Sequence, residues 1–284
     1  MQNDVSTQMS SEMSVDSHFH VFEAGQSVPE ARYSPDYDAQ FSDWQSAARQ
    51  VGVTHGVLVQ TSFMGTDNSY LLKKLQQNPD TLRGVAVVSP TAGFGQLTDL
   101  HAQGVRGIRL NLAGQSHDMA TWQAAGSLWD AVLRLGWHVE LHTDTGALPA
   151  VLGAVPLEIP VVIDHFGKPS SASLQDETVQ AVQRRVAAAS SQVYVKLSAA
   201  YRLQAGLEPS RLAKLWLDEL GAKALLWGSD WPCTNFEAKA DYAALHGALA
   251  DWLGHDAAVM QAARSANPMR LYWGLPFATD FTSR

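Results

Sequence analysis

Two histidines separated by one residue, His18 and His20, form the pattern in this sequence that points most directly to chemistry. Side chains at positions i and i+2 of an extended strand leave from the same face, so the two imidazoles would converge on one point. Three further groups of the same kind, His142, His165 and Asp230, each stand at or near the end of an apolar run. Imidazole and carboxylate groups can hold a divalent metal ion, activate water and transfer protons. We therefore expect these five side chains to form one site.

Eight short apolar runs along the chain are typical of buried strands. Most are continuously apolar rather than alternating, as expected for parallel strands that are covered on both faces. The two neighbouring histidines belong to the first run, and His142, His165 and Asp230 close the fifth, sixth and eighth. The runs cover residues 15–21, 55–60, 84–88, 105–112, 137–142, 161–165, 193–198 and 224–230.

Segments with helical length or helical spacing separate these runs. In the first segment, Phe41, Trp44, Ala48 and Val51 fall on one helical face and form an apolar stripe suited to packing on a sheet. The expected helical segments are residues 39–51, 69–75, 121–135, 176–189 and 209–220, followed by 237–253 and 257–266 after the last strand.

The alternation of eight strands with helices predicts a single-domain α/β protein with the TIM (β/α)8 barrel fold. The chain has 284 residues, and such barrels need roughly 250. A doubly wound open sheet is the alternative, but no glycine-rich phosphate loop follows the first strand. We expect residues 1–14 to be a flexible extension and residues 15–284 to form the barrel. Reactive groups of a barrel lie at the carboxyl ends of its strands, which is where the histidines and Asp230 stand.

Charge and composition exclude several classes of function. The chain has 20 Lys and Arg against 28 Asp and Glu, so we do not expect nucleic acid as a partner, because phosphate binding needs a basic surface. The single cysteine, Cys233, excludes an intrachain disulfide and a thiolate metal cluster. Residues 1–9 are polar and resemble neither a signal peptide nor a membrane helix, so no membrane partner is expected and a cytoplasmic location is the default. The oligomeric state stays open.

The ordered set of groups resembles the amidohydrolase superfamily, in particular the amidohydrolase-related branch that holds lactone hydrolases. The resemblance covers nearly the whole chain and rests on His18-x-His20, on His142 and His165, and on Trp-Gly-Ser-Asp-Trp-Pro at residues 227–232. Residues 32–35, 65–68 and 104–109 are also similar to that branch, which includes the 2-pyrone-4,6-dicarboxylate lactonase group and sugar lactonases. A His-x-His pair alone is a weak signal, whereas the ordered set with Asp230 is a strong one.

The donor types favour one divalent metal ion, zinc in particular, with a ligand shell of His18, His20, His142 and Asp230. His165 then remains to contact the attacking water or the substrate carbonyl, and Asp230 acts as general base and afterwards as general acid. Relatives that resemble the pyrone-dicarboxylate lactonase work without metal and carry a tyrosine where this chain has His142, so His142 favours a metal. A metal-free mechanism, in which the histidines polarise the carbonyl directly, is the alternative.

Cationic and amide side chains near the strand ends are the candidates for substrate binding. Arg109 lies inside an apolar strand, where an unpaired charge would be costly. Arg202 matches a carboxylate-binding arginine of the lactonase relatives, and Arg32, in the loop after the first strand, is equally consistent with a surface charge. Gln60 and Asn111 are candidate hydrogen-bonding groups. A guanidinium holds a carboxylate with two parallel hydrogen bonds, so we expect an anionic small molecule as the substrate.

The predicted reaction is the hydrolytic opening of a lactone that bears a carboxylate or derives from a sugar. Residues 111–115 lack the arginine that the dicarboxylate enzyme supplies after strand four, which favours a mono-acid or sugar-derived lactone. The alternatives are a metal-dependent decarboxylase of an unsaturated carboxylic acid, a metal-free 2-pyrone-4,6-dicarboxylate lactonase, and an anion-binding barrel without activity. Asp164, next to His165, is expected to point away from the barrel interior. Lys196 is expected to face inward or to be structural.

Overall fold

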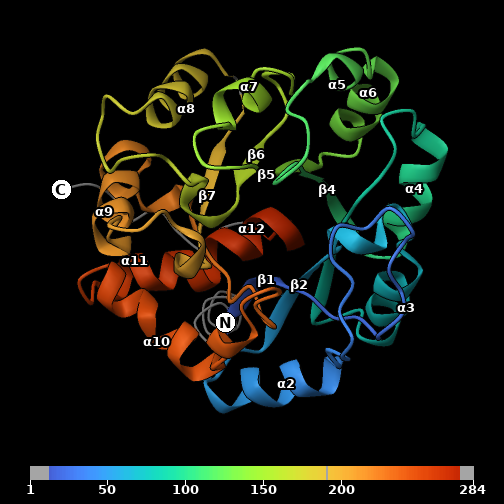
Figure 1. The fold of residues 1–284 in the computed structure, drawn as a ribbon, viewed down its shortest axis with the longest axis horizontal. Coiled ribbons are helices and arrows are strands. Elements are labelled where there is room, and N and C mark those ends of the chain that lie inside the picture. The colour runs from blue at the N-terminus through green and yellow to red at the C-terminus, as the bar shows by residue number, and fades with distance from the viewer. Residues whose placement is uncertain (1–12, 190, 276–284) are drawn as a thin grey trace, which may run out of the picture.

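Eight parallel strands form one sheet in the order β1 to β8 in a computed structural model that describes residues 13–189 and 191–275. Helices surround the sheet (Figure 1), and the predicted TIM barrel is confirmed. Residues 1–12 of the expected N-terminal extension lie outside the described residues, whereas the Ser14 carbonyl accepts hydrogen bonds from Thr54 and His55. The strands are β1 (Val15–Phe19), β2 (His55–Val59), β3 (Leu82–Ala86), β4 (Val105–Asn111), β5 (His138–His142), β6 (Val161–Ile163), β7 (Val193–Leu197) and β8 (Leu225–Trp227).

Most helices agree with the sequence pattern. The expected helix 121–135 is divided into α5 (Ala120–Gln123) and α6 (Gly126–Arg134). Three helices were not expected, namely α4 (Phe94–Ala102), α7 (Leu148–Leu152) and α12 (Asn267–Trp273). The start of α4 carries glycine, which disfavours helix, and α7 is too short for a helical period to show. The remaining helices are α2 (Phe41–Gln50), α3 (Ser69–Gln77), α8 (Glu177–Ala188), α9 (Pro209–Leu220), α10 (Tyr242–Trp252) and α11 (Ala257–Gln261). None of these described helices is long and apolar enough to cross a membrane.

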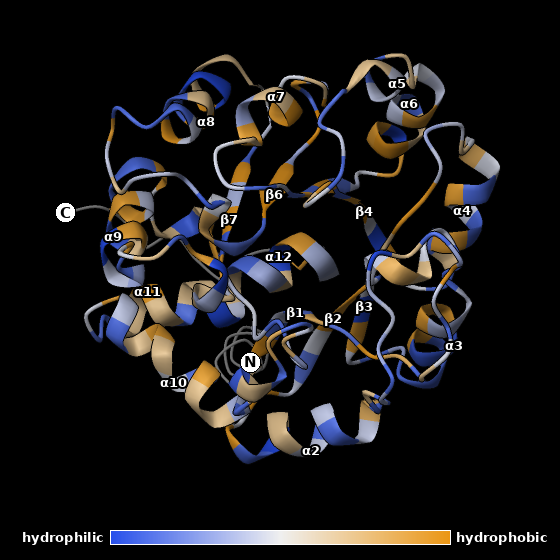
Figure 2. Cartoon of the chain, in the orientation of Figure 1, coloured by the Kyte–Doolittle hydropathy of each residue, from blue (hydrophilic) through white to orange (hydrophobic). Residues whose placement is uncertain are grey.

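Two hydrophobic clusters stabilise the barrel. The larger one lies between the strands and the surrounding helices, and Figure 2 shows apolar residues in the strands and on the helix faces turned toward them. The smaller cluster fills the barrel interior with strand valines and includes Met269 and Tyr272 of α12. The Asn267 amide of α12 donates to the Leu225 carbonyl at the start of β8 at 2.7 Å. Helix α12 therefore closes the amino-terminal end of the barrel, and the opposite end is left for a site.

The barrel closes where β1 meets the segment that follows β8. The Asp230 N–H donates to the His18 carbonyl, and the His20 N–H donates to the Trp231 carbonyl, both at 2.8 Å. The two backbones approach so closely that a Cβ atom at Gly228 would lie 2.5 Å from the His18 Cβ. Only glycine fits at this position, and the closure brings Asp230 beside the His18-x-His20 pair.

A buried carboxylate, that of Asp16, reinforces this seam. It accepts hydrogen bonds from the Ser229 hydroxyl at 2.6 Å, from Trp44 Nε1 of α2 at 3.0 Å and from the Tyr242 hydroxyl of α10 at 2.9 Å. Burial raises the pKa of Asp16, and these donors offset part of the cost of removing the carboxylate from water. The seam is thus tied to two helices as well as closed by backbone hydrogen bonds.

Replacing the seam glycine tests this description. We expect Gly228→Ala to lower the free energy of unfolding by about 1–3 kcal/mol, because the added methyl group overlaps the His18 backbone. Urea-induced unfolding measures the change. Gly247→Ala in α10 is the control, since its Cβ would meet nothing within 4 Å, and there alanine should be neutral or stabilising. Equal stability of Gly228→Ala and the wild type would contradict the close contact.

Candidate active site

Three imidazoles and one carboxylate gather at the carboxyl ends of β1, β6 and β8. Asp230 Oδ1 lies 3.3 Å from His20 Nε2, 3.5 Å from His18 Nε2 and 3.9 Å from His165 Nε2. The two Nε2 atoms of His18 and His20 are 3.3 Å apart. All four side chains are buried. The structure therefore brings together, around one carboxylate oxygen, residues that are far apart in the sequence.

Each of these imidazoles contacts a partner at its other nitrogen. His20 Nδ1 lies 2.7 Å from the Val59 carbonyl oxygen, so it carries a proton and Nε2 has a free lone pair. His165 Nδ1 lies 2.9 Å from the Ser198 hydroxyl. His18 Nδ1 lies 3.0 Å from the Lys196 ammonium and 3.3 Å from Asp164 Oδ1. These contacts fix the ring orientations before any ligand arrives.

His142 lies beside this group, with its ring centroid 4.7 Å from that of His165. Its Nδ1 is 3.1 Å from Asn111 Oδ1, and its Nε2 is 3.4 Å from the Lys168 Nζ. Burial lowers the pKa of Lys168 to about 8, so at neutral pH the lysine is an ammonium that only donates, and His142 Nε2 accepts. The ligand atoms of His18, His165 and Asp230 all lie within 4.8 Å of one another, so His165 belongs to this group. His165 Nε2 thus faces the Asp230 carboxylate, and the predicted ligand role of His142 stays a prediction.

The second oxygen of Asp230 is held by hydrogen-bond donors. The Tyr201 hydroxyl donates to Oδ2 at 2.6 Å and Arg202 Nε donates at 2.8 Å. Burial alone would raise the pKa of the Asp230 carboxyl, but Arg202 and His165 together hold it well below its usual range. Asp230 is therefore ionised, with Oδ1 turned toward the imidazoles. Tyr201 was missed by sequence reasoning, and its only signal was its position next to Arg202.

A layer of buried charges lies directly beneath the imidazoles. Asp164 Oδ2 accepts from Arg109 Nε at 2.9 Å, and Lys196 Nζ lies 2.7 Å from Glu140 Oε1. Lys196 faces the barrel interior, which is one of the two orientations expected from the sequence. The expectation that Asp164 points away from the interior is wrong. Strand β6 ends at Ile163 and His165 has a φ of 54°, so strand alternation no longer applies and both neighbouring side chains face inward.

A pocket of about 430 Å³ opens above this group. His20, His142, His165 and Asp230 line it, and so do four of the five predicted substrate-binding residues, namely Arg32, Arg109, Asn111 and Arg202. The fifth, Gln60, is buried outside the lining, and its amide donates to the Asp67 carbonyl at 2.7 Å. Gln60 thus supports the loop after β2.

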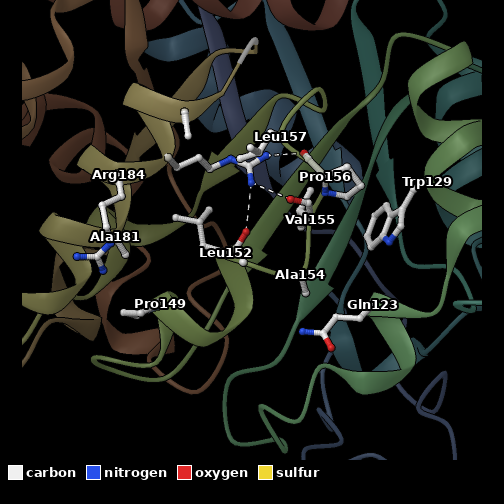
Figure 3. Close-up of a pocket in the computed structure, with 13 residues that line it drawn as sticks. Gln123, Trp129, Pro149, Leu152, Ala154, Val155, Pro156, Leu157, Ala181 and Arg184 are labelled. Carbon is white, nitrogen blue, oxygen red and sulfur yellow. Dashed lines mark hydrogen bonds between the residues drawn. The ribbon is translucent and has the colours of Figure 1, made fainter.

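A larger cavity of about 570 Å³ lies on the outer surface, between α6, α7 and α8 (Figure 3). Its buried arginine, Arg185, donates to the backbone carbonyls of Leu152, Val155, Pro156 and Ile159 at 2.8–3.2 Å. These bonds join α8 to the segment after α7. None of the imidazoles described above lines this cavity, so the smaller pocket is the candidate active site.

Comparisons with known proteins agree with this geometry. The chain is 29% identical over 278 residues to 2-pyrone-4,6-dicarboxylate hydrolase of Comamonas testosteroni, covering 91% of this chain and 90% of that protein. It is 28% identical over 229 residues to 4-sulfomuconolactone hydrolase of Rhizobium radiobacter, covering 78% of this chain and 76% of that protein. A crystal structure from Pseudomonas putida, assigned to the 2-pyrone-4,6-dicarboxylic acid hydrolases, is 34% identical with a TM-score of 0.81 and covers 92% of this chain and 98% of its own.

The decarboxylase alternative has weaker support. A 2,6-dihydroxybenzoate decarboxylase from Rhizobium is 15% identical with a TM-score of 0.62, which shows a shared fold alone. The Amidohydrolase family, in contrast, matches residues 15–273, nearly the whole barrel. The chain therefore belongs to the amidohydrolase family, as the order of His18, His20, His142, His165 and Asp230 predicted.

Proposed function

We propose that this protein is a hydrolase that opens an anionic lactone by attack of water on the ring carbonyl. The observation that carries the proposal is the Asp230 carboxylate, which offers one oxygen to a pocket lined by imidazoles and arginines. The curated relatives, a pyrone-dicarboxylate hydrolase and a sulfomuconolactone hydrolase, support the same class of reaction.

Asp230 supplies the proton transfers that ring opening needs. Its Oδ1 accepts a proton from the attacking water as the new carbon–oxygen bond forms, and later returns that proton to the ring oxygen as the carbon–oxygen bond of the ring breaks. Tyr201 and Arg202 hold Oδ2, so the reacting oxygen stays directed into the pocket. The products are a carboxylic acid and a hydroxyl group, or an enol that tautomerises.

The donor set fits one divalent metal ion, for which we propose zinc. A tetrahedral zinc ion with bonds of about 2.0–2.1 Å separates its ligand atoms by roughly 3.3–3.4 Å. The distances among Asp230 Oδ1 and the Nε2 atoms of His18 and His20 are 3.3–3.5 Å, and His165 adds a fourth donor 3.9 Å from Asp230 Oδ1. A bound ion would acidify water and polarise the carbonyl. Residues His18, His20, His165 and Asp230 would hold it, with His165 in place of His142.

Burial keeps His18 and His165 neutral, which suits both a metal-dependent and a metal-free mechanism. It lowers the pKa of His18 to about 4 and that of His165 well below its usual value, so both are neutral at neutral pH. Neutral imidazoles can ligate an ion or hydrogen-bond to a carbonyl directly. The metal-free mechanism is therefore the alternative within the same proposal, and it uses the same base, Asp230.

The role of Asp230 is tested by a change that keeps its shape. We expect Asp230→Asn to reduce kcat for 2-pyrone-4,6-dicarboxylate by about 10²–10⁴-fold, because an amide does not accept the proton of water. Loss of the pyrone absorbance measures the rate, and circular dichroism checks the fold. Asp218→Asn, at an exposed ion pair with Lys214, should retain full activity. Wild-type-like turnover by Asp230→Asn would contradict its role as the base.

The exchange of His142 and His165 is tested by zinc affinity, which needs no substrate. We expect His165→Ala to weaken Zn²⁺ binding by about 100-fold or more, and His142→Ala by less than about 10-fold, because His142 Nε2 is engaged by Lys168. Competition with a chromophoric chelator measures both affinities. Exposed His255→Ala is the control. The reverse order of losses would restore the ligand shell expected from the sequence.

A further inference from the structure

We infer that Arg32 and Gly114 form an anion subsite at the rim of the pocket, and that it receives a carboxylate on the lactone ring away from the carbonyl under attack. The inference rests on the proposed function, because it concerns the substrate of the same pocket. Arg32 comes from the loop after β1 and Gly114 from the loop after β4. Both residues line the pocket.

Of the three arginines that line the pocket, Arg32 is the one whose guanidinium is free to bind an anion. Arg109 places both Nε and one terminal nitrogen 2.9 Å from Asp164 Oδ2. Arg202 donates to Asp230 at 2.8 Å and to the Thr234 carbonyl at 2.9 Å. Arg32 has no hydrogen bond or ion pair to any of the residues that the structure describes, although it lines the same pocket. An incoming carboxylate can therefore bind Arg32 without displacing an internal partner.

Gly114 provides the place where this guanidinium rests. Its φ is 65°, and a Cβ atom at this position would overlap Arg32 Nη1 and lie 3.2 Å from Cζ. The guanidinium thus lies directly against the Gly114 backbone, where any side chain would displace it. The Gly114 N–H donates to both carboxylate oxygens of Asp144 at 2.9 Å, which holds the turn in position. Two loops from distant parts of the chain together define where Arg32 stands.

The remaining groups on this side of the pocket suit an anion. Asn111 and His142 line the wall, and the buried Lys168 lies 3.4 Å behind His142 Nε2. The Asp144 carboxylate in the same wall is already engaged by the Gly114 N–H. Asp230 lines the same pocket, so with the carbonyl carbon at Asp230 we expect a carboxylate on another ring carbon to face this wall. Residues 111–115 contain no arginine, but Arg32 supplies a cation there from another loop.

Two substrates that differ in charge test the subsite. They are 2-pyrone-4,6-dicarboxylate and uncharged 2-pyrone. We expect Arg32→Gln to raise the KM for the dicarboxylate by about 10–100-fold with little change in kcat, because a charge-assisted hydrogen-bond pair is lost. The kcat/KM for 2-pyrone should stay within about twofold of the wild type. Arg184→Gln, at an exposed arginine of α8 outside this pocket, should leave the kcat and KM for both substrates unchanged.

The glycine is tested in the same assays. We expect Gly114→Ala to reproduce the Arg32→Gln pattern, because the methyl group displaces the guanidinium. The double variant should be no worse than Arg32→Gln alone, since both changes remove one interaction. Gly136→Ala is the matched control, because Gly136 has a φ of 64° and nothing within 4 Å of its Cβ position. It introduces the same backbone strain without touching Arg32.

The outcomes separate this inference from the proposed function. Suppose that the wild type opens the dicarboxylate, and that Arg32→Gln changes the kcat/KM of both substrates equally or of neither. The subsite proposal is then wrong and the lactonase proposal stands. If the wild type opens neither compound, the lactonase proposal fails. Calorimetric titration with 2-pyrone-4,6-dicarboxylate then still tests the subsite, because the expected weakening by Arg32→Gln and Gly114→Ala is a property of binding. Equal affinities of wild type and both variants would overturn it.

Discussion

The contact between β1 and the segment after β8 is the constraint on which the site depends. Backbone hydrogen bonds join His18 to Asp230 and His20 to Trp231, and Gly228 lets the two backbones meet without an intervening side chain. Since His18 and His20 lie at one end of the chain and Asp230 near the other, only a closed barrel brings the carboxylate between the imidazoles. The chemistry of the pocket is therefore a consequence of barrel closure, and a change that opens the seam would alter fold and site together.

Paired charges explain how so many ionisable groups are tolerated inside the barrel. Glu140 and Asp164 face Lys196, Arg109 binds Asp164, and Arg202 binds Asp230, so each of these three buried carboxylates has a cationic partner. A buried charge without a partner would cost several kcal/mol, roughly as much as a large part of the stability of a domain. His18 and His165 are neutral within this network, because burial disfavours the imidazolium and lowers the pKa of both. The same buried ion pairs therefore stabilise the barrel and surround the reacting groups.

The pocket combines two kinds of support. Its floor is built from strand ends, where backbone hydrogen bonds and buried partners hold each ring in one orientation. Its rim is built from loops, where Arg32 lies against Gly114 and the Tyr33 hydroxyl donates to Glu237. Rigid strands suit the reacting groups, which must be placed within fractions of an ångström. Loops suit groups that choose among substrates, because loop residues can change without disturbing the barrel.

The sequence by itself determined the barrel and the identity of the reacting groups, because strand period and apolar runs are local properties. A His-x-His pair on a strand also places both imidazoles on the same face. The sequence did not show that His165 Nε2 faces the Asp230 carboxylate. That position follows from the left-handed backbone at His165, which arises where strand geometry ends. The inward turn of Asp164 has the same origin. The contact between Arg32 and Gly114 could not be predicted from the sequence either. It depends on two loops meeting in space, and only the tertiary structure decides such contacts.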